Sequence, residues 1–154
     1  MRYWLFKSEP SSFSLEDLMA RPQQTEHWDG VRNFQARNYM RAMEVGDRAF
    51  FYHSSCAVPA IVGEVDISRA AYPDHTAWDP HNHHYDRRAS VDNPLWSMVD
   101  VVFRVRYRQP VTLRDLKNCP ALSGMPLLAR GNRLSVLPVT RQEWQVIQKL
   151  ISAT

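Results

Sequence analysis

The order in which apolar patterns follow one another is the feature that most constrains the fold of this chain. A run of consecutive apolar residues predicts a buried strand, a period of about 3.6 predicts a helix, and strict alternation predicts a half-solvated strand. In chain order the patterns predict a strand at residues 3–6, a short helix starting at Ser14, a helix at 33–43, strands at 48–53, 61–67 and 98–108, a short helix starting at Thr112, a strand at 133–139 and a terminal helix starting at Thr140. Because strands and helices do not alternate regularly, a doubly wound parallel sheet is unfavourable. We expect an α+β fold, with a small curved sheet or barrel and helices at its rim.

The longest predicted strand alternates between apolar and basic positions. We expect its inward face to consist of Val99, Val101, Phe103, Val105 and Tyr107, with the arginines between the later members turned outward. In the strand at 61–67, the face that carries Glu64 is expected to be mostly solvated. Residues 70–96 are rich in Pro, Asp, Asn and His. An irregular stretch of this length inside a small domain is uncommon and is often functional.

Composition limits the class of protein. The apolar share of 44% and the charged share of 23% are ordinary for a globular protein, and 154 residues suffice for one domain spanning residues 1–154. The chain has no run of about 18 apolar residues, no signal-peptide pattern and only two cysteines. We therefore expect a protein without membrane contact, located in the cytoplasm of a bacterium or in the nucleus of a eukaryote.

The segment at residues 28–33 has a composition suited to a ligand pocket. It follows neither a helix nor a strand period, and its sequence is Trp28-Asp29-Gly30-Val31-Arg32-Asn33. Gly30 allows a turn that other residues resist, so the indole and the neighbouring polar groups can face one space. A flat ligand that forms hydrogen bonds, such as a nucleobase, suits such a pocket. The alternative is a loop that packs its tryptophan into the core, as most tryptophans do.

Two predicted strands end in polar residues that are candidates for the same pocket. Lys7 and Ser8 directly follow the first strand, and His53 and Ser54 end the strand at 48–53. Ser8 can donate and accept hydrogen bonds, Lys7 can donate, and His53 could read a base edge. His53 could also act as a general base toward a nearby nucleophile. The structural alternatives are a surface turn and a buried, hydrogen-bonded histidine.

The irregular stretch carries the histidines His75, His81, His83 and His84, with aspartates among them. They form a possible metal cluster, but their spacing matches no tight metal-binding motif and no cysteine lies nearby. We expect no physiological metal and no cofactor. Trp78, in the same stretch, could close over a ligand or fill the side of the core.

Basic residues near the 28–33 segment could bind phosphates. Sixteen of the nineteen basic residues are arginine, which makes bidentate phosphate contacts, although such a bias also arises from genome composition. Arg37 and Arg41 lie four residues apart on the predicted helix and, with Arg32, could form a phosphate track. Arg133 could clamp a further phosphate. A solvated helix face and a plain turn are the alternatives.

Several motifs, in order and over almost the whole chain from residue 2 to about residue 150, resemble those of the EVE domain family. They are residues 3–10 (YWLFKSEP), 28–33 (WDGVRN), 35–38 (QARN), 51–54 (FYHS), 71–74 (AYPD), 96–101 (WSMVDV) and 133–136 (RLSV). This resemblance implies a PUA-like fold, a mixed β-barrel with flanking helices that is related to YTH and ASCH domains. It also implies the recognition of modified bases in DNA, including methylated cytosine.

The resemblance also implies roles for single residues. Lys7 and Ser8 match the pocket edge, Trp28 and Asp29 match an aromatic wall and its polar neighbour, His53 and Ser54 match the end of the central strand, and Trp78 loosely matches a second ring. We predict a non-enzymatic monomer that takes a modified base, in DNA rather than RNA, into this pocket.

In this interpretation Asn33 reads the base together with the residues above, and Arg32, Arg37, Arg41 and Arg133 hold flanking phosphates. One alternative is an enzyme that acts on a nucleotide or modified RNA through His53 or a metal site within residues 75–84. Another is a module that kept the fold but binds a small molecule or a protein.

Overall fold

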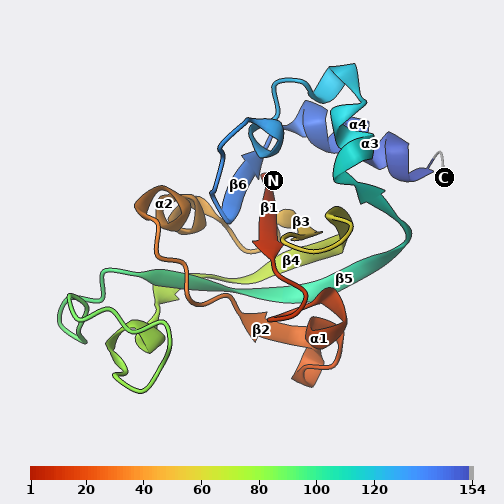
Figure 1. The fold of residues 1–154 in the computed structure, drawn as a ribbon. Helices are drawn as coiled ribbons and strands as arrows, with labels where there is room; N and C mark the ends of the chain where they lie inside the picture. The colour runs from red at the N-terminus through yellow and green to blue at the C-terminus, as the bar shows by residue number, and fades with distance from the viewer. Residues whose placement is uncertain (153–154) are drawn as a thin grey trace.

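The computed structural model of the protein describes residues 1–152 and shows a six-stranded mixed sheet with helices packed around it (Figure 1). The strands are β1 (Tyr3–Ser8), β2 (Thr25–His27), β3 (Arg48–His53), β4 (Ala60–Pro73), β5 (Ser97–Thr112) and β6 (Val136–Val139). Their order across the sheet is β2-β5-β4-β3-β1-β6. β1 and β3 are parallel, whereas the other neighbouring pairs are antiparallel. The α+β class predicted from the order of the elements is confirmed.

The sheet is open, which differs from the barrel named in the prediction. β2 and β6 lie at its two edges, and each pairs with a single neighbour within residues 1–152. These strands have only three and four residues, so neither offers much backbone for closing the sheet. The long strands β4 and β5 bend around the core (Figure 1), and bulges interrupt their register.

The helices begin where the sequence places their N-terminal caps. They are α1 (Leu15–Met19), α2 (Phe34–Ala42), α3 (Leu113–Lys117) and α4 (Arg141–Ser152), with 3-10 turns η1 (Pro22–Gln24), η2 (His75–Trp78), η3 (Pro120–Leu122) and η4 (Pro126–Leu128). Ser14 and Thr112 each form a capping box with the residue three positions later, and Asn33 caps α2. Thr140 exchanges the same pair of hydrogen bonds with Glu143 before α4. No helix within residues 1–152 has the length and apolar character needed to cross a membrane.

Alternate residues of β1 divide the core between the two faces of the sheet. Trp4 and Phe6 belong to a cluster that also contains apolar residues of α1 and α2. Leu5, between them, belongs to a second cluster that includes residues of α3 and α4. Trp28 is a member of the first cluster, so the loop that follows β2 is anchored to this half of the core.

Several strand boundaries and two exposures differ from the sequence predictions, among them the end of β5, which lies at Thr112 rather than at residue 108. β4 continues to Pro73, so residues 70–73 are strand rather than loop, and β6 begins only at Val136. Register shifts between β4 and β5 break the expected alternation, and Val105 is 37% exposed rather than inward. Glu64, expected in solvent, is buried because it accepts hydrogen bonds from the side chains of Tyr107 and Gln148. An alternating pattern of apolar residues does not show where a β-bulge will shift the strand. It also does not show that a side chain far away in the sequence will donate a hydrogen bond.

Candidate functional site

An open cavity of about 630 Å³ lies between the end of β1, the loop that follows β2 and the irregular segment before β5. Its lining consists of Lys7, Ser8, Glu9, Ser12, Phe13, Arg21, Glu26, His27, Trp28, Asp29, Gly30, Val31, His83, His84 and Ser135. This volume is typical of sites that bind small organic groups. The lining mixes aromatic rings, hydroxyls and charges of both signs, which suits a planar polar ligand.

Trp28 lines the cavity with only a small part of its surface. It is 9% exposed, and its ring centroid lies 4.9 Å from that of Phe6, 6.1 Å from that of Phe13 and 5.6 Å from that of Phe51. Its backbone N–H donates to the Val99 carbonyl at 2.7 Å. Trp28 is therefore both a pocket residue and a core residue, because its ring is part of the core and part of the cavity wall.

Gly30 adopts the left-handed backbone conformation that glycine favours, with φ at 79°. Its N–H donates to Oδ2 of Asp74 at 2.9 Å. A Cβ atom at this position would lie 2.4 Å from Nε2 of His84, so only glycine lets the histidine ring rest on the backbone. The loop after β2 and the segment before β5 meet at this contact.

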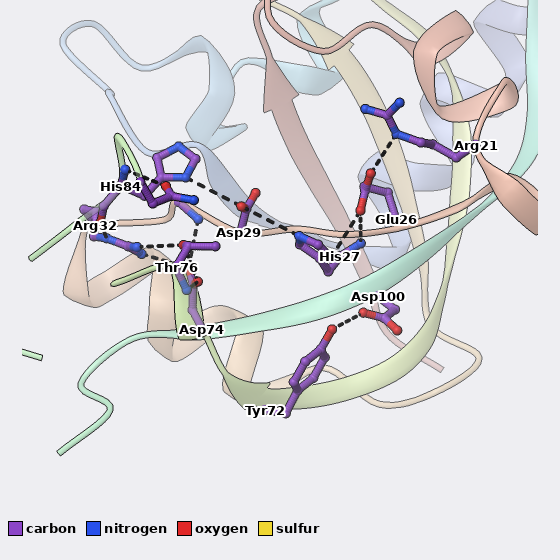
Figure 2. A network of polar contacts seen from close by, with 12 residues as sticks. Arg21, Glu26, His27, Asp29, Arg32, Tyr72, Asp74, Thr76, His84 and Asp100 are labelled. Atoms are coloured by element: carbon purple, nitrogen blue, oxygen red, sulfur yellow. Dashed lines mark hydrogen bonds and ion pairs between the residues drawn. The ribbon is translucent and has the colours of Figure 1, made fainter. Parts of the chain in front are cut away.

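A partly buried ion pair fixes the same loop to the end of β4 (Figure 2). Nη1 of Arg32 lies 2.9 Å from Oδ2 of Asp74, whose side chain has no exposed surface. Arg32 also donates to the His84 carbonyl at 3.0 Å and to Oγ1 of Thr76 at 3.3 Å. Burial opposes ionisation of Asp74, but hydrogen bonds from Thr76, Gly30 and Arg32 outweigh it and hold its pKa below the ordinary value. The Arg32 guanidinium is therefore engaged within the protein.

Lys7 and Ser8 both line the cavity where β1 ends. The Lys7 amine is half-buried, and burial lowers its pKa. No hydrogen bond or ion pair within residues 1–152 engages this amine, so it is available to a ligand. Oγ of Ser8 donates to the Phe13 carbonyl at 2.6 Å, which leaves its lone pairs as acceptors.

Asp29 lies between two histidines on the cavity wall (Figure 2). Its Oδ2 is 3.6 Å from Nδ1 of His84 and 3.8 Å from Nε2 of His27. Nδ1 of His27 is 3.2 Å from Oε1 of Glu26, and Oε2 of Glu26 accepts from Nε of Arg21 at 2.7 Å. These side chains form a continuous polar chain along the wall, in which the Asp29 carboxylate can accept hydrogen bonds from a ligand.

Four residues predicted for the pocket lie outside its lining. The Asn33 side chain caps α2, and Nε2 of His53 accepts from the first N–H of α1 at 3.1 Å. Burial lowers the pKa of His53, which suits this acceptor role of the neutral ring. The N–H of Ser54 donates to the Ser8 carbonyl at 3.0 Å, behind the cavity edge. Trp78 ends η2 and does not reach the cavity.

The arginines of α2 contact the chain just before β5. Nη1 of Arg37 donates to the Leu95 carbonyl at 2.8 Å, and Nε of Arg41 donates to Oγ of Ser97 at 3.0 Å. Leu95 has a positive φ of 62°, which a leucine rarely adopts. The two arginines thus brace an unusual turn. Arg133 is exposed and lies outside the cavity lining.

The histidines of residues 75–84 do not converge on one point. His75 lies beside His27 with ring centroids 6.0 Å apart, the rings of His83 and His84 lie 3.8 Å apart at the cavity, and His81 is exposed. Within residues 1–152, no three His, Cys, Asp or Glu side chains are placed to hold a metal ion. The enzyme alternative that requires a metal therefore has no ligand set in this part of the chain.

Sequence reasoning missed part of the lining. Phe13, Arg21, Glu26 and His27 were not identified, because each belongs to a segment whose own pattern is that of an ordinary turn or strand. His83 and His84 were singled out only as metal ligands. The one available signal was the polar composition of the irregular stretch, which marked it as functional without showing where it folds.

A mixed, open sheet with flanking helices and a polar cavity beside an aromatic core defines a small α+β domain. The chain belongs to the EVE domain family, whose model matches residues 2–150. The predicted family membership is therefore confirmed, and with it the fold of the solved relatives.

Relatives of known name and structure cover nearly the whole chain. Human thymocyte nuclear protein 1 is 46% identical over 164 residues, which cover 96% of this chain and 73% of that protein. A crystal structure from Pseudomonas putida is 49% identical with a TM-score of 0.91, covering 97% of this chain and 99% of that one. The crystal structure of the human THYN1 protein in complex with 5-methylcytosine containing DNA is 44% identical with a TM-score of 0.93, and it covers 98% of both chains.

Proposed function

We propose that the protein is a non-enzymatic module that binds DNA and takes a modified base, such as methylcytosine, into the cavity beside Trp28. The observation that carries this proposal is the human THYN1 structure with 5-methylcytosine containing DNA, which aligns with 98% of this chain. The cavity provides chemistry that fits a base, because aromatic rings, an available amine and a carboxylate face one space of about 630 Å³.

The residues that reach the cavity are proposed to contact the base. Lys7 would donate to a ring nitrogen or carbonyl oxygen, whereas Asp29 and Ser8 would accept from an exocyclic amine. Stacking of a base on an aromatic ring contributes about 1–3 kcal/mol. Because Trp28 is only 9% exposed, we expect its share to be at the lower end, with Phe13 completing the apolar surface.

The other predicted residues are proposed to act by holding the site in place. His53 anchors α1, Ser54 supports the backbone of Ser8, and Asn33 starts α2 directly after the cavity loop. Arg32 is assigned to the loop that it fixes through Asp74. We assign no base contact to Trp78.

Flanking phosphates would contact guanidinium groups outside the cavity. Arg37 and Arg41 use only some of their N–H groups within the protein, and Arg133 is exposed, so all three keep donors for phosphate. One cavity accommodates one base, and we propose that the chain binds as a monomer. The human relative is named a nuclear protein. For this chain we propose the compartment that holds its DNA, which is the nucleus in a eukaryote and the cytoplasm in a bacterium.

The decisive experiment is a binding titration with two DNA strands that differ by a single 5-methylcytosine. Fluorescence anisotropy at fixed salt concentration gives the affinity of the wild type, Lys7→Met and Asp29→Asn for both strands. Lys117→Met is the matched control, because Lys117 is exposed on α3 and lies outside the cavity lining.

We expect Lys7→Met to weaken binding of the methylated strand by about tenfold or more, as for the loss of a charge-assisted hydrogen bond. Asp29→Asn should reduce the preference for the methylated strand, and Lys117→Met should behave like the wild type. A wild type that binds neither strand, or that binds both strands equally, contradicts the proposal.

A further inference from the structure

One wall of the cavity carries a chain of ionisable side chains whose net charge changes sign when two histidines take up protons. In order along the wall they are Arg21, Glu26, His27, Asp29 and His84 (Figure 2). All of them line the cavity, and successive members lie 2.7, 3.2, 3.8 and 3.6 Å apart. With neutral histidines the chain holds one positive and two negative charges. With both histidines protonated it holds three positive and two negative charges.

We propose that binding of a polyanionic nucleic-acid strand at this wall is coupled to proton uptake by His27 and His84. The coupling rests on the proposed function and adds to it a mechanism that sets affinity. A wall with a net negative charge repels phosphates, and the same wall with a net positive charge attracts them. The strand would therefore favour the protonated form of the wall.

His84 is placed so that its proton affinity depends on what occupies the cavity. Its Nδ1 is buried and has no hydrogen-bond partner within residues 1–152, and the nearest carboxylate oxygen belongs to Asp29 at 3.6 Å. Burial lowers the pKa of His84, Asp29 and Asp74 act to raise it, and His83 and Arg32 act to lower it. The ring is consequently neutral in the free protein near pH 7. A phosphate beside it would add the negative potential that favours the imidazolium.

His27 lies in a similarly mixed field at the other end of the wall. It faces Glu26 on its own strand, Asp29 from the following loop and His75 from η2. Asp100, its register partner on β5, accepts a hydrogen bond from a tyrosine of β4. The His27 side chain is 40% exposed, so a phosphate can approach it directly.

His83 is the one other histidine of the lining, and its ring lies 3.8 Å from that of His84. Ordinary carboxylates and guanidinium groups keep their charges between pH 5.5 and 8, because their pKa values lie well outside this range. The ordinary pKa of a lysine is near 10.4, and burial lowers the pKa of Lys7 from that value. Histidine is the side chain whose ordinary pKa lies inside this range, so the histidines dominate the pH response.

The test is a titration of one methylated DNA strand at pH 5.5, 6.5, 7.5 and 8 at constant ionic strength. Linkage predicts that affinity falls with rising pH, by up to about tenfold per pH unit for each proton taken up. Calorimetry in buffers with different ionisation heats counts these protons directly. The variants are His27→Gln, His84→Gln and the double variant. The control is His81→Gln, because His81 is an exposed histidine of the same segment outside the lining.

We expect proton uptake in the wild type and in His81→Gln, a smaller uptake in each single variant and little in the double variant. Binding of the wild type without pH dependence overturns the coupling and leaves the proposed function standing. A double variant that folds, by circular dichroism, and keeps the full pH dependence overturns it as well. Failure of the wild type to bind at every pH contradicts the proposed function itself.

Discussion

The imidazole of His84 rests on the backbone of Gly30, so a residue of the irregular segment closes a cavity whose opposite wall comes from the N-terminal strand. The contact is possible because position 30 has no Cβ and adopts a left-handed conformation. The pair thus joins two segments that are far apart in the sequence, and it determines the shape of the cavity.

We predict that Gly30→Ala lowers the free energy of unfolding by about 2–3 kcal/mol. The left-handed conformation costs an alanine about 1–2 kcal/mol, and the new methyl group must also displace the His84 ring. Gly46→Ala is the matched control, because Gly46 has a φ of 94° but no atom within 4 Å of the added Cβ. Urea unfolding measures the free energy of unfolding of both variants. The prediction is wrong if the two glycine variants lose the same stability, or if His84→Ala does not recover part of the loss in the Gly30→Ala background.

A second prediction concerns the ion pair between Arg32 and Asp74. Asp74→Asn should lower the free energy of unfolding by about 3 kcal/mol, because it leaves a partly buried guanidinium without its counter-charge. The substitution also replaces the charged acceptor of the Gly30 N–H with a neutral one. Asp92→Asn, at an exposed aspartate of the same irregular segment, should change stability by no more than about 0.5 kcal/mol. Equal effects of the two substitutions in urea unfolding would refute a stabilising role for the pair.

The sequence predicts local features of this fold well because their causes are local. Ser14, Asn33, Thr112 and Thr140 stand at helix starts, and each side chain bonds a backbone N–H of its own helix within three residues. The turn at Gly30 follows from a single residue in the same way. These features do not depend on where the rest of the chain lies.

Long-range packing accounts for what the sequence did not predict. Nothing near His84 in the sequence indicates that it will lie on Gly30, and nothing near His53 indicates that its ring will accept from α1 rather than face the cavity. Arg32 was expected to bind phosphate, yet Asp74 meets it through tertiary folding alone. Residue type therefore predicted which residues lie near the cavity better than it predicted which side chains face the cavity.

Trp28 leads to a third prediction. Trp28→Ala should cost about 3–5 kcal/mol of stability, because it empties the space between Phe6, Phe13 and Phe51. Because the ring is only 9% exposed, this substitution should affect the fold as well as the cavity. Tyr85→Ala removes an aromatic ring that is 45% exposed and should have a small effect. Thermal and urea unfolding of both variants test this, and a stable Trp28→Ala protein would show that the ring is not part of the core.

The fourth prediction concerns acid stability and the buried carboxylate of Asp47. Burial opposes its ionisation, but hydrogen bonds from the Glu44 N–H at 3.0 Å, the Trp4 indole at 3.0 Å and the Arg2 N–H at 3.1 Å hold its pKa below the ordinary value. Because the pKa is depressed in the folded state, the unfolded chain binds more protons in the range between the two values. The stabilisation is fully present above the unfolded pKa, about 3.9, and is lost as the pH falls through the folded pKa.

Asp47→Asn should therefore be less stable than the wild type at pH 7 and should lose less additional stability between pH 5 and pH 2. The amide oxygen of asparagine can still accept from two of the three donors, but the side chain carries no charge that acid can remove. Urea unfolding at a series of pH values gives the two curves, with Asp92→Asn as the exposed reference. Curves for Asp47→Asn and the wild type that run parallel from pH 7 to pH 2 would mean that the three donors do not depress the pKa of Asp47. The acid sensitivity of the fold would then have to arise at other carboxylates with depressed pKa values, such as Asp74.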